Sequence, residues 1–212
     1  FVPFKESRDP AVSSAGLIFG NVSVVFVCRS GEQQVWSMYP QLQPDGKSLR
    51  RWGKIHDGEV LAGAGEGVYA AEGNKCYLAV AGGRLQLRNM TTGTLRWEGE
   101  APAGSIRQVA FSGNYDRFTA LSADGKLHRW SIDDHHPESS WGAFFGKIWY
   151  EGATAPDYTW QSSSGSDEFE AKYSMMPLIY GTAKGTFFAL LFALPIALTA
   201  AIYVSQFLRP EY

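Results

Sequence analysis

A long uncharged apolar run near the C-terminus constrains this chain more than any other feature. From Thr186 to Leu208, 23 consecutive residues carry no charge, and Phe, Leu, Ala and Ile dominate. A helix needs about 20 mostly apolar residues to cross the hydrocarbon core of a bilayer, because that core is about 30 Å thick and each residue adds about 1.5 Å. Core helices of this length that are apolar all round are uncommon in small domains. The run therefore predicts a membrane-spanning helix.

The residues in and beside the run indicate how such a helix would sit. Arg209 follows it directly, which favours a cytoplasmic C-terminal end. Lys184 lies at the other end, where its side chain could reach the interface or face a protein interior. Small residues supply a face for close packing against other helices. They are Ala193, Ala197, Ala200 and Ala201.

The chain before about Asp133 is typical of β-structure with tight turns. Of the 212 residues of the whole chain, 14% are aromatic and 23 are Gly. Three pieces share one pattern, in which an apolar strand is followed by a turn with Gly and then by a second strand. They are Val24–Met38, Tyr77–Trp97 and Phe118–Asp133. Gly suits the turns because it adopts the positive φ that hairpin turns demand.

The spacing of these pieces predicts repeats. Their turn glycines Gly31, Gly83 and Gly125 are 52 and 42 residues apart, the spacing of propeller blades. The segment Ser105–Asp133 is similar to a WD40 blade. The predicted fold is mainly β, a partial β-propeller of WD40-like blades, followed by a transmembrane α-helix. Three blades cannot close a ring, so either blades are missing upstream or the sheets form an open array. Because Phe1 is also not Met, we expect a fragment.

Composition divides the chain into three parts. Residues 1–135 are the predicted propeller-like region of about three blades, 136–176 are a connector, and 177–212 carry the membrane helix. The connector has a Ser/Gly-rich centre, which predicts a solvent-facing segment. Its acidic residues are expected to form a solvated surface. They are Asp157, Asp167, Glu168 and Glu170.

The last 70 or so residues resemble a known family. The stretch "FFGKIWYEG", the "PLIYGT" of Pro177–Thr182 and the helix pattern of Ala189–Ser205 look like the permease subunit of bacterial phosphate ABC importers. Some members of that family carry a large periplasmic insertion between their first two membrane helices. The resemblance implies that residues 1–140 are the C-terminal part of such an insertion.

The resemblance implies a membrane permease subunit for inorganic phosphate that is not itself an enzyme. ATP hydrolysis would reside on partner ATP-binding subunits, and the sequence holds no GxxxxGK[ST]. The other implied partners are a second permease subunit, a periplasmic phosphate-binding protein and membrane lipid. The implied location is the bacterial inner membrane, with residues 1–176 periplasmic. A net charge of −2 gives no basic footprint for nucleic acid.

Polar groups in the membrane segment are the candidates for a substrate path. Phosphate is costly to dehydrate, so a path would offer hydroxyl and cationic donors. The candidates are Thr182, Lys184, Thr186, Thr199 and Ser205. The alternative is that the hydroxyls bond to carbonyls of their own helix and that Lys184 lies at the membrane interface.

The sequence assigns no catalytic, cofactor-binding or metal-binding residue and therefore predicts no cofactor. His135 and His136 are adjacent, and adjacent residues on an extended chain point apart, which makes a poor chelate. The Gly-rich stretch Gly63–Asn74 is interpreted as blade turns. Cys28 and Cys76 are expected to be buried thiols in strands, and whether they pair stays open.

A second function remains open at this point. The chain could be a membrane-anchored β-propeller that serves as an interaction or sensor module, with the helix as a plain anchor. A coupling-loop motif and further spanning helices after Tyr212 would favour the permease, whereas a short tail would favour the anchor.

Overall fold

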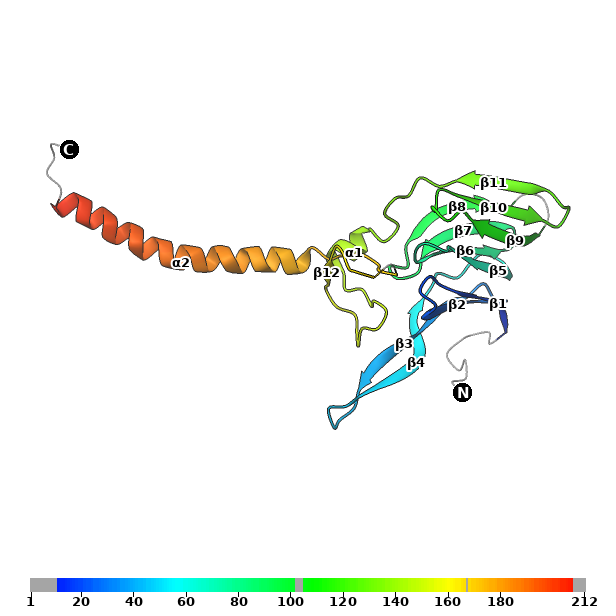
Figure 1. The fold of residues 1–212 in the computed structure, drawn as a ribbon, viewed down its shortest axis with the longest axis horizontal. Coiled ribbons are helices and arrows are strands. Elements are labelled where there is room, and N and C mark those ends of the chain that lie inside the picture. Colours follow the sequence, from blue (N-terminus) through cyan, green and yellow to red (C-terminus); the bar gives the residue numbers. More distant parts are fainter. Residues whose placement is uncertain (1–10, 102–104, 167, 208–212) are drawn as a thin grey trace.

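The computed structural model describes residues 11–101, 105–166 and 168–207. It consists of antiparallel β sheets followed by one long helix that projects away from them (Figure 1). This confirms the coarser part of the predicted fold class, a mainly β chain with an apolar C-terminal helix.

Eleven strands form three sheets, and within each sheet the strands pair in chain order. The first sheet holds β1 (Val12–Leu17), β2 (Ser23–Cys28), β3 (Gln33–Leu42) and β4 (Ser48–Asp57). The second sheet holds β5 (Gly65–Ala70), β6 (Cys76–Ala81), β7 (Arg84–Asn89) and β8 (Leu95–Glu100). The third sheet holds β9 (Ile106–Phe111), β10 (Arg117–Ser122) and β11 (Leu127–Ser131). We call these eleven strands together the β body.

Each of the three repeated sequence pieces forms the predicted hairpin. The turns lie between β2 and β3, β6 and β7, and β10 and β11. Gly31, Gly83 and Gly125 have φ angles of 82°, 78° and 82°, the left-handed region that side chains with a Cβ rarely adopt. The Gly-rich stretch Gly63–Asn74 differs from its prediction, because its centre is strand β5 rather than turn.

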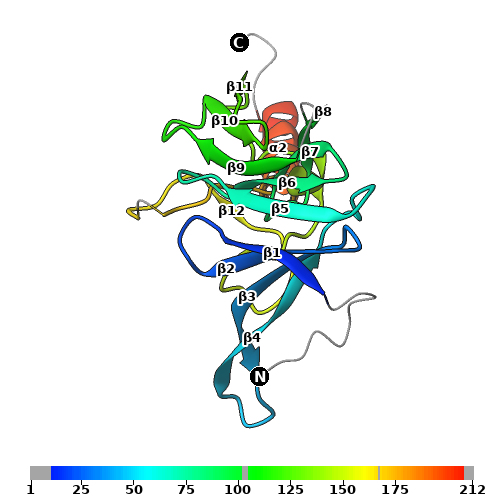
Figure 2. The ribbon, with the colours of Figure 1, turned by 90° about the vertical axis from the view of Figure 1, so that its right-hand side faces the viewer.

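The second sheet lies between the other two (Figure 2). Its first strand, β5, contacts β1 on one side and β9 on the other. Strand β6 is buried along its whole length because its two faces enter different cores. Tyr77 and Ala79 pack into the core shared with the first sheet, whereas Leu78 and Val80 pack with Phe118 of the third. This explains why β6 reads as a continuous apolar run.

The first and second sheets meet at a glycine. A Cβ added to Gly65 would lie 2.2 Å from the carbonyl oxygen of Cys28, closer than any real Cβ contact. The absence of a side chain at residue 65 therefore sets the distance between the two sheets.

The helix α2 (Met176–Phe207) begins ten residues before the predicted apolar run and has 32 residues. Pro177 lies in its first turn, where proline is tolerated. Pro195 lies inside it, and the helix curves (Figure 1). Leu208 and Arg209 lie outside the described residues.

The connector contains a short helix α1 (Trp141–Phe145) and a small hairpin of β12 (Trp160–Gln161) and β13 (Lys172–Tyr173). These elements lie where α2 begins (Figure 1). The residues 161–166 are exposed, as predicted for a solvent-facing segment, but Tyr150 and Ser174 on either side are 6% and 2% exposed. The connector is therefore packed, rather than solvent-facing, at both of these flanks.

Candidate functional site

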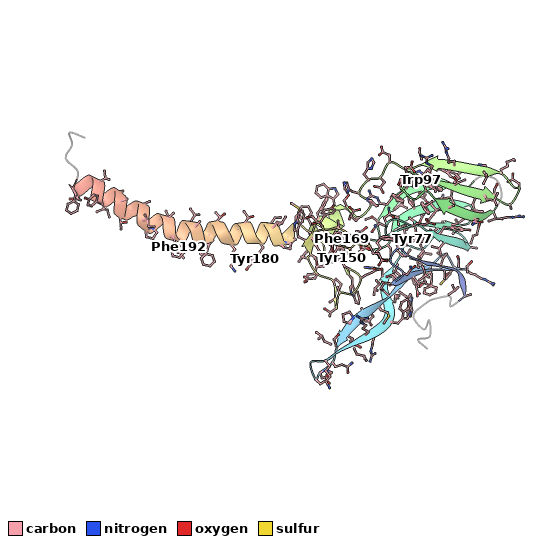
Figure 3. The ribbon with its side chains drawn as sticks, in the orientation of Figure 1. Tyr77, Trp97, Tyr150, Phe169, Tyr180 and Phe192 are labelled. Carbon is pink, nitrogen blue, oxygen red and sulfur yellow. The ribbon has the colours of Figure 1, made fainter. Side chains whose placement is uncertain are left out.

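The helix α2 presents apolar side chains on every side. Residues 177–207 are all exposed, including large ones such as Phe192 and Ile196, each 67% exposed. Tyr180 and Phe192 project from α2 well away from the β body (Figure 3). The helix is long and apolar enough to span a membrane, which fits anchoring in a bilayer.

The five predicted path residues all lie on α2, and three of their hydroxyls bond to the helix itself. Thr182 donates to the carbonyl of Leu178 at 2.9 Å. Thr199 donates to the carbonyl of Pro195 at 2.9 Å, and Ser205 donates to that of Ile202 at 3.0 Å. Such bonds satisfy a hydroxyl in a surrounding without water.

The helix does not bring the five residues together. Thr182 and Ser205 are 23 positions apart, which separates them by about 35 Å along the axis. Thr182 and Thr186 share one face, four residues apart, with Ala189 and Ala193 following on that face. Any closed path along these residues needs further helices beside α2.

A buried ion pair joins the connector to the β body. Lys75 Nζ lies 2.6 Å from Glu151 Oε2, and the two side chains are only 5% and 17% exposed. Ser23 donates to the other carboxylate oxygen of Glu151, and Lys75 also donates to the carbonyl of Phe19. One connector carboxylate thus contacts both the first and the second sheets.

Glu170 lies beside this pair, and its surroundings contradict the prediction that it belongs to a solvated acidic surface. Its Oε2 accepts a hydrogen bond from Thr91 at 2.8 Å, while its Oε1 is shielded from solvent and has no hydrogen-bond partner among the described residues. Burial raises the pKa of the Glu170 carboxyl to about 7. Glu170 is therefore not part of a solvated acidic surface. Glu168 and Asp157 are exposed, as expected, and Asp167 lies outside the described residues.

Two further contacts hold the connector in place. Arg96 of β8 donates to the carbonyl of Ser139 in the connector at 2.9 Å and forms a bidentate pair with Asp134, two residues before the connector begins. His56 Nε2 lies 3.1 Å from the carbonyl oxygen of Trp149, whose ring packs against Tyr39 at 5.4 Å. The connector is thus tied to the β body at separate points on two sheets.

These contacts surround a cavity of about 380 Å³ between the β body and the connector. Its walls carry both signs of charge and several amides. They include Lys75, Asn74, Asn89, Asp134, Glu138 and Glu170. Phe169, which also lines it, and the nearby Tyr150 lie between the sheets and the start of α2 (Figure 3). Of the charged residues in its walls, Lys75 is already paired with Glu151, and Asp134 with Arg96.

The other positions singled out in the sequence are placed as follows. His136 Nδ1 lies 3.2 Å from Glu138, and His135 lies 3.5 Å from Asp133 on the surface. No group of three His, Cys, Asp or Glu that could hold a metal ion occurs in residues 11–101, 105–166 and 168–207. Cys28 and Cys76 are buried in different sheets, and burial raises the pKa of the Cys76 thiol to about 12.

The sequence does not predict the contact between the connector and the β body, which we call the junction. Lys75, Glu151 and Glu170 are up to 95 positions apart, and no local pattern links them. The available signal was the aromatic stretch "FFGKIWYEG", whose apolar residues needed a surface to pack on.

Comparison with known proteins adds little to this geometry. No family model matches the sequence. No curated protein matches it either. Among solved structures, the chain is similar to Hsv2p of the yeast Kluyveromyces lactis, with a TM-score of 0.43 and 16% identity over 60% of this chain and 39% of that one. A second Hsv2 structure from the same yeast gives a TM-score of 0.44 and 16% identity over 59% and 39%. The chain thus matches about two fifths of the length of these structures, at a similarity too low to carry an argument.

Proposed function

We propose that the chain is part of the membrane permease subunit of an ABC importer for inorganic phosphate. The observation that carries the proposal is the 32-residue helix α2, exposed and apolar on every side and fixed to a folded β body through a packed connector. A helix of this kind needs lipid and other helices around it. The sequence features of the last 70 residues supply the family and the substrate.

The β body would be a periplasmic insertion built of three propeller-like blades. Each sheet is an antiparallel meander, and the first strands of neighbouring sheets contact each other, as blades around a common axis do. The third sheet has three strands, and the sheets do not close into a ring within the described residues. Further blades from elsewhere in the protein would complete the domain.

Translocation would use the polar face of α2 together with helices from the rest of the transporter. Thr182 and Thr186 lie on one face beside small residues that allow another helix to come close. Lys184 would offer the cation that attracts phosphate, and Thr199 and Ser205 would continue the path. Partner ATP-binding subunits would supply the energy, and a periplasmic binding protein would deliver phosphate.

The test is uptake of radiolabelled phosphate by a deletion strain that carries the full-length gene. We expect the deletion to abolish growth on limiting phosphate and the gene to restore it, with sulfate uptake unchanged. Lys184→Ala should lower phosphate uptake, whereas Lys126→Ala, at an exposed lysine in the turn between β10 and β11, should not. Normal phosphate uptake in the deletion strain would overturn the proposal.

One observation favours the second candidate, a membrane-anchored interaction or sensor module. The hydroxyls of Thr182, Thr199 and Ser205 are all satisfied within α2, as in a plain anchor. In that case replacing α2 by an unrelated spanning helix would preserve function, whereas a permease would lose transport.

A further inference from the structure

Exposed aromatic side chains outside α2 gather at one place. Four Phe or Trp residues of the described part of the chain outside α2 are among its exposed large hydrophobics, and three of them belong to the connector. Trp141 is 80% exposed, Phe145 is 48% exposed and Trp160 is 41% exposed. We call these three residues the aromatic foot. Soluble surfaces rarely concentrate aromatic side chains in this way, so the foot needs a partner.

The foot is fixed to the start of the membrane helix. The amide of Met175 donates to the carbonyl of Phe144 in α1 at 2.8 Å, and α1 contacts strand β13. The hydroxyl of Ser140 caps α1, and the buried side chain of Ala143 anchors its inner face. The rings of Trp141 and Phe145 stack at 5.8 Å on its outer face. The foot therefore cannot move far from the point where α2 begins.

The length of α2 places that point relative to a bilayer. Its 32 residues span about 48 Å. A bilayer is about 30 Å thick in its hydrocarbon core and about 40–45 Å thick with its headgroup layers. A spanning α2 therefore begins in one headgroup layer and ends in the other. Lys184, about 12 Å along the helix, then lies near the outer edge of the hydrocarbon core.

We propose that the aromatic foot inserts into the membrane–water interface on the side where α2 enters the bilayer. The inference rests on α2 spanning a membrane and names lipid as the occupant of this surface. Trp prefers the headgroup level because its ring is amphipathic, and Phe145 would reach the acyl boundary. The exposed Lys147, two residues after Phe145, suits the phosphates of the headgroups. Foot and helix together set the depth of α2 and the height of the β body above the membrane.

The test uses the full-length protein in liposomes, with a spin label on a cysteine introduced at Gly142 of α1. A Cβ at Gly142 meets only Ser140 at 3.6 Å, so the substitution is tolerated, and the native cysteines are buried. Lys126→Cys, in the β10–β11 turn at the end opposite α2, is the matched control (Figure 1). A spin label on Ala193→Cys in the middle of α2 reports whether the helix spans the bilayer.

We expect a water-soluble nickel chelate to collide with the Gly142 label several-fold less than with the Lys126 label, and oxygen to reach the Gly142 label readily. Trp141→Ser combined with Phe145→Ser should raise the nickel accessibility at Gly142 and leave that at Lys126 unchanged. Equal nickel accessibility at Gly142 and Lys126 would overturn the inference, as would a Gly142 label shielded from nickel and oxygen alike, which indicates a protein contact. If the Ala193 label reports lipid in either case, α2 spans the membrane and only the position of the foot is wrong.

Discussion

The β body and α2 use apolar residues in opposite ways. In the β body, Phe118 is 1% exposed and Leu78 is fully buried, each within an apolar core. In α2, the apolar residues of 177–207 are exposed, and the hydroxyls bond to the helix itself. Water stabilises the first arrangement, because burial removes apolar surface from it, and lipid stabilises the second. The two regions therefore belong in different solvents, and the connector marks the boundary.

The largest expected effect compares one phenylalanine from each region. Phe118→Ala should destabilise the β body by about 3–5 kcal/mol, because it leaves a cavity among Trp97, Phe111 and Trp130. Phe192→Ala should leave the stability of the β body unchanged, because its ring contacts no strand. Denaturant unfolding of the protein in detergent, followed by tryptophan fluorescence, measures both. Equal losses would show that α2 packs against the β body.

A charge introduced in the centre of α2 tests whether that part of the helix lies in lipid. Leu191→Arg should disfavour membrane insertion of α2 by about 3 kcal/mol, because the guanidinium leaves water for hydrocarbon. Leu191→Ile is the control and should insert as well as the native helix. An insertion reporter fused to α2 measures the ratio of spanning to translocated chains. Unchanged insertion of the arginine variant would contradict a lipid-facing position for residue 191.

The close contact at Gly65 between the first two sheets predicts a smaller loss of stability. Gly65→Ala should destabilise the β body by about 1–3 kcal/mol, since its methyl group would overlap the carbonyl of Cys28. Gly113→Ala has open space and should cost far less. Thermal unfolding of the two variants distinguishes them. Similar melting temperatures would mean that the sheets can move apart without cost.

A further expected effect concerns the contact between the connector and the β body, and it depends on pH. The pKa of Glu170 is about 7 in the folded protein against an ordinary 4.5, so between these values the folded chain holds a proton that the unfolded chain has lost. This contribution to stability is fully present below pH 4.5 and is lost as pH rises through 7. Glu170→Gln, which stays neutral, should flatten that fall.

The exposed Glu168 offers the matched control. Glu168→Gln should leave the pH profile of the native protein intact, because that side chain is in water in both states. The measurement is the free energy of unfolding from pH 4 to pH 8 for the three proteins. A steep fall that persists in Glu170→Gln would assign the pH dependence to another group.

Local patterns in the sequence predict the elements of both regions. Tight hairpin turns require positive φ, which Gly83 and Gly125 adopt readily, so glycines between two strand patterns predict the hairpins. The apolar run predicts α2 because a run of that length and composition is typical of a spanning helix. The helix begins at Met176, one residue before the Pro177 that opens the predicted membrane segment, and Thr182 and Lys184 interrupt the apolar pattern but not the helix.

The packing between distant segments could not be predicted in this way. Glu170 reads as a solvated acid in a polar loop, and only the fold brings it under Thr91. The ten-residue strands of the protruding β3–β4 hairpin, likewise, have no counterpart in the repeat pattern. A single sequence does not indicate which distant surfaces pack together, so the contacts between the connector and the β body could be identified only from the structure. The five path residues stay a prediction.

The central claim is that α2 crosses a bilayer and carries the β body on its non-cytoplasmic side. Labelling of single cysteines by a membrane-impermeant maleimide in spheroplasts tests it most directly, with Lys126→Cys in the β body and Ser205→Cys near the end of α2. We predict that Lys126→Cys reacts in intact spheroplasts and that Ser205→Cys reacts only after the membrane is permeabilised. Equal labelling of both positions before permeabilisation, or recovery of the protein in the soluble fraction, would contradict the claim.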